Sequence, residues 1–332
     1  ILEHLSNSGL TIPCGPDEGW TRILVEKPFG NDVDTAKKLD KKLGTLFDEE
    51  QIFRIDHYLA KETLQNILAF RFNNSLFEPL WNSHHIDAVH IKLIEKDGID
   101  TRGGFYDDVG ALKDVGQNHI LQMLALVAME APKNFDASSI RKERAKILSL
   151  LKPFADKTIR KLANRGQYDG YINEKGVKRN SQTETYFRLE TYIENNRWKG
   201  VPFYLESGKG LNESKSEIDI YFKNEHDPER QNILTFRIQP DEGIKIRFFV
   251  KTPGFDTATE SKILKFKYSD HPTLQTLPDA YERVLYDAIK GDQTLFTSTD
   301  EVLHAWKFIT PILSLWKAIP LNIYKKGSED ML

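Results

Sequence analysis

Five strand-like stretches follow one another in the second half of the chain, with no helical pattern between them. They cover residues 183–194, 217–222, 232–239, 244–250 and 262–268. Short turns connect them, whereas a parallel pair of strands needs a long crossover connection, usually a helix. This half of the chain is therefore predicted to form a large, mostly antiparallel sheet.

The preceding and following segments add one more strand and several helices. In 86–95 the apolar residues Val89, Ile91 and Leu93 alternate with polar ones, and the same alternation places Glu95 in the apolar row. Helical spacing and capping signals predict helices over 56–72, 110–130, 139–151, 278–290 and 298–311. Residues 56–332 are thus expected to form one α+β domain, with helices on one face of the sheet.

Residues 1–55 have a different character. A buried strand within 20–28, a helix from Asn31 to Leu46 and a second strand at 52–55 form one parallel α/β unit, typical of a Rossmann-type domain. One such unit is too short for a doubly wound sheet, and no Gly-x-Gly-x-x-Gly segment occurs in the sequence. We therefore expect a truncated remnant of a dinucleotide-binding domain. Because the chain starts at Ile1, its beginning is expected to be a cut or processed edge.

Charge and cysteine content exclude several classes of partner. The 46 Lys and Arg residues nearly balance the 49 Asp and Glu residues, which gives a net charge of -3. The sequence therefore has no excess of positive charge that would indicate binding to nucleic acid or to a membrane surface. A single cysteine, Cys14, can form neither an internal disulfide nor a cysteine-based metal site, and no metal site is predicted. Cytoplasmic location is the expectation.

One candidate site lies at the predicted start of the helix over 56–72. Asp56 is placed to cap it, and His57 and Lys61, four residues apart, would share a face next to the free N–H groups of its first turn. This arrangement suits a phosphate group. Taken alone, the same residues also fit a capped surface helix with a solvated lysine.

A second candidate site is the helix over 110–130. His119 lies at the edge of its apolar run, and Asp114, five residues earlier, would sit about 140° round an α-helix, so that the two side chains would flank a ligand. A buried histidine is ordinarily a hydrogen-bonded core residue. At a cavity edge with a carboxylate behind it, however, an imidazole suits general-base catalysis near neutral pH. Lys27, just after a parallel strand, lies where open α/β sheets bind ligands, although a lysine in a turn is usually only solvated.

Three motifs in this order resemble the glucose-6-phosphate dehydrogenase family. They are Glu26-Lys-Pro-Phe-Gly30, Arg54-Ile-Asp-His-Tyr-Leu-Ala-Lys-Glu62, and Arg102-Gly-Gly followed by Gln117-Asn-His-Ile-Leu-Gln-Met-Leu124. Shorter matches follow at 201–203, 208–209, 237–240 and 277–283. The resemblance therefore covers essentially the whole chain.

The resemblance implies oxidation of glucose 6-phosphate to 6-phosphogluconolactone, with NADP or NAD as hydride acceptor. It implies that His119 takes the proton from the C1 hydroxyl, that Asp56 pairs with the imidazole, and that Lys27 contacts both sugar and nicotinamide beside Pro28. The remaining substrate contacts that it implies are His57, Tyr58 and Lys61 for the phosphate, and Glu95, Asp114, Lys209 and Gln239 for the sugar ring. A homodimer or homotetramer is also implied.

Departures from the family pattern leave alternatives open. Ala60 replaces a glycine, and Ser214 stands where the family usually has a basic residue near the phosphate, a role that the next residue, Lys215, could take over. Without a glycine-rich loop, the cofactor half is expected either upstream or on a separate polypeptide. A catalytically silent sugar-phosphate-binding or dimer-forming module is the alternative from another class. A Gfo/Idh/MocA-type sugar dehydrogenase also carries Glu-Lys-Pro, but the segment 56–61 argues against it.

Overall fold

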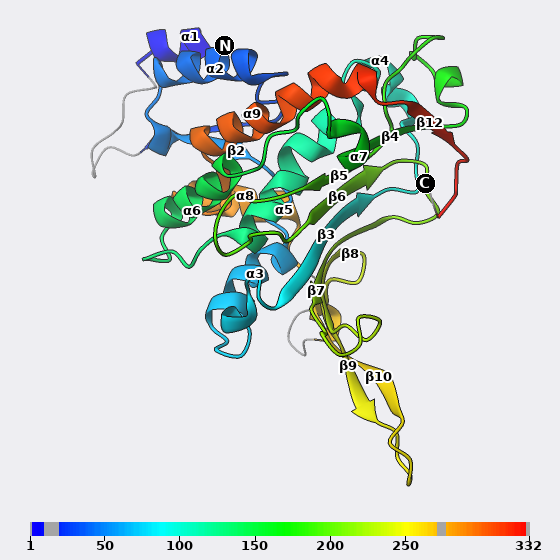
Figure 1. Ribbon diagram of the computed structural model, residues 1–332. Coiled ribbons are helices and arrows are strands. Elements are labelled where there is room, and N and C mark those ends of the chain that lie inside the picture. Colours follow the sequence, from blue (N-terminus) through cyan, green and yellow to red (C-terminus); the bar gives the residue numbers. More distant parts are fainter. Residues whose placement is uncertain (1, 10–19, 271–276, 330–332) are drawn as a thin grey trace.

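The computed structural model describes residues 2–9, 20–270 and 277–329. Ile1 and Cys14 lie outside the described residues. Within the described part of the chain, nine strands form one sheet in the order β10-β9-β8-β7-β3-β6-β5-β4-β12 (Figure 1). The strands are β3 (Ile86–Ile94), β4 (Ala163–Tyr168), β5 (Tyr186–Thr191), β6 (Phe203–Gly208), β7 (Lys215–Phe222), β8 (Ile233–Gln239), β9 (Gly243–Lys251), β10 (Thr259–Lys267) and β12 (Leu321–Tyr324).

Neighbouring strands of this sheet are antiparallel except for the pairs β3–β6 and β4–β12, which are parallel. All five predicted strands are present, as β5, β7, β8, β9 and β10. The sequence analysis missed β4, β6 and β12. β4 reads Ala-Asn-Arg-Gly-Gln-Tyr and has no β-branched residue, so its strand conformation is imposed by its neighbours and not by its own preference.

Helices cover one face of the sheet (Figure 1). They include α3 (Glu62–Phe72), α5 (Leu121–Ala128), α6 (Ala137–Ser149), α7 (Ile159–Leu162), α8 (Ala280–Lys290) and α9 (Thr299–Leu315). The apolar row of β3 (Val89, Ile91 and Leu93) is at most 2% exposed and belongs to the main core. The predicted α+β architecture, with helices on one face of a mostly antiparallel sheet, is confirmed. The strands β9 and β10 extend from the body as a hairpin (Figure 1).

A smaller sheet has the order β1-β2-β11, with β1 (Ile23–Val25) parallel to β2 (Ile52–Ile55) and β11 (Phe296–Thr297) antiparallel to it. Helix α2 (Val33–Gly44) connects β1 and β2, and α1 (Leu2–Asn7) precedes them. The predicted strand, helix and strand order is confirmed. The prediction of a buried first strand is wrong, because β1 lies at the edge of this sheet as far as the described residues show, and Leu24 is 39% exposed.

Two predicted helix ends need correction. The cap of α2 is Asp32 and not Asn31: the Asp32 carboxylate accepts from the backbone N–H of Thr35, whose hydroxyl accepts in turn from the N–H of Asp32. The last long helix does not end at Pro311 but continues to Leu315. Pro311 is exposed and the next residue, Ile312, is fully buried, so packing of the following turn outweighs the hydrogen bond that proline removes.

Asp56 does not cap a helix. Residues 57–60 form turns in which the N–H of Leu59 bonds to the Asp56 carbonyl and the N–H of Lys61 to the Tyr58 carbonyl, and α3 starts only at Glu62. The N-cap of α3 is Lys61, whose side chain makes no capping bond. The Asp56 carboxylate instead accepts from the Tyr58 N–H at 3.1 Å and faces His119.

The core helix from Gly110 to Ala128 is not a regular α-helix. Its residues Leu112–Ile120 are π-helical, and the α-helical part α5 follows them. In a π-helix each turn closes on the fifth residue, so residues five apart lie nearly one above the other. Asp114 and His119 therefore share a side of the helix, and the predicted 140° separation is wrong.

The short helix α4 (Gly103–Tyr106), which precedes this segment, begins with two glycines. A Cβ at Gly103 would lie 2.2 Å from the backbone oxygen of Lys175, whereas the nearest atom to a Cβ at Gly104 is 4.0 Å away. Only Gly103 is therefore required for close packing against the loop at 175–176.

We expect Gly103→Ala to lower the free energy of unfolding by about 1–3 kcal/mol, because the new methyl group would collide with a backbone atom that cannot rotate away. Gly104→Ala is the matched control and should leave stability unchanged or raise it by up to about 1 kcal/mol. Urea unfolding of the two variants checks this. Equal losses in both would contradict the packing account.

Candidate active site

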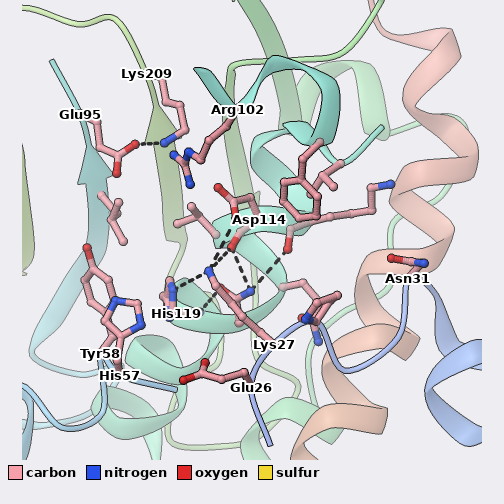
Figure 2. Close-up of a pocket in the computed structure, with 18 of the residues that line it drawn as sticks. Glu26, Lys27, Asn31, His57, Tyr58, Glu95, Arg102, Asp114, His119 and Lys209 are labelled. Carbon is pink, nitrogen blue, oxygen red and sulfur yellow. Dashed lines mark hydrogen bonds and ion pairs between the residues drawn. The ribbon is translucent and has the colours of Figure 1, made fainter. Parts of the chain in front are cut away.

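A cavity of about 590 Å³ opens between the two sheets and the core helix. Its walls are the turn after β1, the turns after β2, the segment from α4 through the π-helix, and the ends of β3, β6 and β8 (Figure 2). The predicted residues that line it are Lys27, Pro28, His57, Tyr58, Lys61, Glu95, Asp114, His119, Lys209 and Gln239. Asp56 does not line the cavity, because it lies behind His119.

A buried imidazole and carboxylate form the centre of the site. His119 Nδ1 lies 2.5 Å from Asp56 Oδ1, and the two residues are 3% and 2% exposed. Burial by itself would raise the pKa of Asp56, but the charge and hydrogen bond of His119 outweigh it and lower this pKa below its usual value. The carboxylate is therefore ionised and can only accept, so Nδ1 carries a proton in this pair and Nε2 is the ring nitrogen left free for another partner.

Lys27 lies against that free nitrogen. Its ammonium is 3.0 Å from His119 Nε2, donates to the backbone oxygen of Asp114 at 3.0 Å, and is 3.6 Å from Asp114 Oδ1 (Figure 2). One ammonium can reach both residues because the π-helix places Asp114 and His119 on one side. The three side chains thus form a connected group at the floor of the cavity.

Two rings from the turn after β2 pack against His119. The ring centroids of Tyr58 and His57 lie 4.4 Å and 4.7 Å from that of His119. Burial, followed by the charge of His119, lowers the pKa of His57 to about 4, although Asp56 opposes the shift. Burial raises the pKa of Tyr58 to about 12. At neutral pH both side chains are therefore uncharged, and Lys61 supplies the charge at this end of the cavity.

Polar groups from the sheet form a further wall of the cavity, next to Tyr58. Glu95 follows β3 and forms an ion pair with Lys209, which follows β6 (Figure 2). Gln239 ends β8 and donates to the Tyr58 hydroxyl at 3.4 Å. The strands β3, β6 and β8 are far apart in the sequence, and the sheet brings Glu95, Lys209 and Gln239 at their ends to the same cavity.

Lys215 does not take over the role suggested for it. Its ammonium forms an ion pair with Glu213 and lies 3.6 Å from Glu217. The side chain lines a separate cavity with His90 and Lys92, on the face of β3 opposite to the buried row. Because Lys215 is turned away from the site, it cannot replace a basic residue at position 214.

The sequence analysis assigned no role to several residues that line the cavity. They are Glu26, Gly30, Asn31, Leu93, Arg102, Phe105, Val109, Lys113, Val115, Gln117, Asn118 and Trp306. Arg102 opens the Arg102-Gly-Gly motif and Phe105 follows it directly in the sequence, so this motif is the sequence signal for both residues. Nothing in the local sequence of Trp306, inside α9, indicates that its indole would reach the cavity and donate to the backbone oxygen of Phe29.

Known proteins resemble this chain along nearly its whole length. Residues 68–331 match the family model described as "Glucose-6-phosphate dehydrogenase, C-terminal domain", and residues 1–66 match "Glucose-6-phosphate dehydrogenase, NAD binding domain". The chain belongs to the glucose-6-phosphate dehydrogenase family. Within the described residues, no helix of this family member has the length and apolar character needed to cross a membrane, and no cluster of three or more potential ligands could hold a metal ion.

Individual family members show the same relationship. The glucose-6-phosphate 1-dehydrogenase of Aggregatibacter actinomycetemcomitans is 48% identical over 95% of this chain and 66% of its own length. "Glucose-6-phosphate 1-dehydrogenase 6, cytoplasmic" of Arabidopsis thaliana is 43% identical over 94% of this chain and 61% of its own. A glucose-6-phosphate dehydrogenase solved with its substrate glucose-6-phosphate is 36% identical and superimposes with a TM-score of 0.91, covering 99% of this chain and 69% of that one. The chain thus spans about two thirds of the length of these relatives.

Proposed function

We propose that this chain carries the substrate-binding and proton-abstracting part of a glucose-6-phosphate dehydrogenase. The reaction oxidises glucose 6-phosphate to 6-phosphogluconolactone, the first oxidative step of the pentose phosphate pathway, and reduces NADP or NAD. The single observation that carries the proposal is the buried pair of His119 and Asp56, whose free imidazole nitrogen opens onto a cavity with a cationic end. A base and a phosphate site are what this oxidation requires of the protein.

In the proposed reaction, His119 Nε2 accepts the proton of the C1 hydroxyl while the C1 hydrogen leaves as hydride and the C1–O double bond forms. Asp56 holds the Nδ1–H and stabilises the imidazolium that results, because it stays ionised beside it. The Lys27 ammonium now occupies the place that the hydroxyl needs, 3.0 Å from Nε2. We propose that it moves aside when sugar binds and then contacts the sugar.

The sugar phosphate is assigned to the end of the cavity with Lys61, His57 and Tyr58, because Lys61 brings a charge and the other two bring hydrogen-bond donors. The ring hydroxyls are assigned to the other polar residues of the cavity, which are Glu95, Asp114, Lys209 and Gln239. Carboxylates and an amide next to an ammonium can both accept from and donate to hydroxyl groups.

Lys27, Pro28 and Asn31 from the turn after β1 line the cavity, and Lys27 lies 3.0 Å from His119 Nε2, so a nicotinamide ring held by this turn would lie near the base. A bound nicotinamide supplies the hydride acceptor, and Lys27 and Pro28 are the residues that would hold it.

We further propose that residues 1–55 belong to the dinucleotide-binding unit and 56–332 to the substrate domain. The missing glycine-rich loop is assigned to a preceding segment or to a separate polypeptide. The protein is proposed to act in the cytoplasm, as the name of the Arabidopsis relative states for that protein, and to assemble as a homodimer or homotetramer. No nucleic-acid or membrane partner is proposed.

The direct test is nicotinamide reduction with glucose 6-phosphate and NADP or NAD. It is run with this chain alone and with the chain joined to a family dinucleotide-binding segment. Thermal shift with glucose 6-phosphate alone measures whether the sugar site exists, since a ligand that binds only the native state stabilises it. Stabilisation without reduction in either form would favour the silent module. Neither stabilisation nor reduction would end the proposal.

We expect glucose 6-phosphate to raise the pKa of His57. In the free protein, burial and nearby cations hold it at about 4, and a phosphate dianion beside the ring would favour its protonated form. The C–H resonances of the imidazole, followed by NMR from pH 3 to 8, should therefore titrate at higher pH with ligand than without. An unchanged pKa at saturating ligand would place the phosphate elsewhere. His90, whose pKa burial also lowers to about 4, serves as the internal control because it does not line this cavity.

A further inference from the structure

The turn after β1, which brings Lys27 to the base, is held by a residue distant in the sequence. Within 20–270 and 277–329, the one hydrogen bond to the backbone of residues 27–30 joins the Phe29 carbonyl oxygen to the indole N–H of Trp306, at 2.9 Å. The donor lies on α9, 277 positions later in the chain. The two residues are 6% and 2% exposed, so this bond is shielded from water.

A second contact between α9 and this part of the chain lies one helical turn further on. The Thr310 hydroxyl accepts from the backbone N–H of Val33 at 3.1 Å, where α2 begins. Trp306 and Thr310 are four residues apart and therefore share one face of α9. Because α9 and α2 lie side by side (Figure 1), this face follows the chain from the turn into the first residues of α2.

The carbonyl held by Trp306 is close in sequence to Lys27. Only Pro28 stands between Phe29 and Lys27, and its ring fixes one of its two backbone dihedrals. A shift of the Phe29 peptide is therefore passed on to the backbone of Lys27. The ammonium of that lysine ends 3.0 Å from His119 Nε2, so the bond to Trp306 determines where the cation stands relative to the base.

Another buried tryptophan forms the same kind of bond but does not belong to the site. The indole N–H of Trp198 donates to the backbone oxygen of Ala128 at 2.9 Å, and this side chain is fully buried. Ala128 is the last residue of α5, and neither residue lines the cavity. Comparison of the two tryptophans therefore separates what a buried indole bond contributes to stability from what it contributes to the site.

We propose that Trp306 is a positioning residue: through the Phe29 carbonyl it holds the turn after β1 and so places Lys27 against the base. This inference rests on the proposed dehydrogenase function, in which Lys27 contacts the sugar and the nicotinamide. It adds to that function a residue of α9 that acts through the turn and not by contact with a ligand. The phosphate end of the cavity, with His57 and Lys61, belongs to the turns after β2 and is independent of this bond.

The first test needs no catalytic activity. In the free protein, ¹⁵N spectra of selectively labelled histidine report the surroundings of His119 Nε2, and Lys27→Ala should shift this resonance because the ammonium is lost. Trp306→Phe should shift it in the same direction, whereas Trp198→Phe should leave it in place. Added to Lys27→Ala, Trp306→Phe should cause no further shift, since its effect on the imidazole is exerted through Lys27.

The second test measures kcat for glucose 6-phosphate oxidation in the form of the chain that reduces nicotinamide. Trp306→Phe should lower kcat by about 10–100-fold, because a small misplacement of a group at the reacting centre has effects of this size. In the Lys27→Ala background the same change should have no further effect. Trp198→Phe should lose a similar amount of stability, since it removes the same kind of buried bond, and should keep its kcat.

A His119 Nε2 resonance that Trp306→Phe leaves unmoved would overturn the inference. Equal shifts with and without Lys27, or an equal shift in Trp198→Phe, would overturn it as well, because the indole would then act by another route. If Trp306→Phe does not fold, benzothienylalanine at position 306 takes its place, since it keeps the size of the indole and lacks only the N–H. A chain that bound no glucose 6-phosphate would end the proposed function, while the NMR comparison would still decide what holds Lys27.

Discussion

Replacing His119 by glutamine should lower kcat for glucose 6-phosphate oxidation by about 10²–10⁴-fold, the usual contribution of a general base. Glutamine fills similar space but cannot accept the proton of the C1 hydroxyl. The sugar contacts on the other walls of the cavity remain, so the dissociation constant for glucose 6-phosphate should change little. Steady-state kinetics and thermal shift with the sugar measure the two quantities separately.

His90→Gln is the control for this variant. His90 is also partly buried and lies against Tyr204 and Tyr221, but it is on the opposite face of the sheet and outside the cavity. Its replacement should leave kcat unchanged. A His119→Gln variant that retained wild-type kcat would show that another group takes the proton.

Replacing Asp56 by asparagine should cost about 10³–10⁴-fold in kcat, by analogy with the loss of the carboxylate in a catalytic triad. The asparagine N–H would donate to Nδ1, so the ring proton would move to Nε2 and block the base. ¹⁵N NMR of the imidazole can detect this change of tautomer directly. A second effect is expected on stability: because the pKa of Asp56 is lowered in the folded protein, its ionised form stabilises the fold near neutral pH, and Oδ1 also accepts from the Tyr58 N–H, so the variant should be less stable than the wild type.

Asp219→Asn provides the comparison for that change. Asp219 is 8% exposed and accepts from the Thr235 hydroxyl, but it lies on β7 outside the cavity. The same chemical substitution at this position should leave both kcat and the imidazole tautomer unaltered. If Asp56→Asn retained high activity with Nδ1 still protonated, the carboxylate would not be what holds the tautomer.

Local patterns predicted much of the fold. The alternation in β3 placed Val89, Ile91 and Leu93 in the core and put Glu95 in their row, which is why its carboxylate reaches the cavity. The strand at 52–55 was predicted with its observed ends. These features depend on neighbouring residues only, since side-chain alternation and capping are set within a few positions of the chain.

Features that depend on tertiary contacts were not predictable in the same way. Asp56 precedes a helical pattern and looks like a cap, yet its carboxylate is drawn to His119, a residue 63 positions later. The π-helical turns at 112–120 have no separate sequence signature, so the five-residue spacing of Asp114 and His119 was read with the wrong period. The sequence did not show which face of the sheet the Lys215 side chain occupies, because the pairing of β7 with β8 shifts register between Ser216 and Glu217.

The central claim is that the imidazole at position 119 offers Nε2 to the sugar hydroxyl while its other nitrogen stays bonded to Asp56. Selective ¹⁵N labelling of histidine, with spectra taken before and after addition of glucose 6-phosphate, tests this without any cofactor. We predict that the Nε2 resonance of His119 shifts as the sugar hydroxyl replaces the Lys27 ammonium, and that Nδ1 stays protonated. A sugar complex that leaves the Nε2 resonance in place, or a ring protonated at Nε2 alone, would contradict the account.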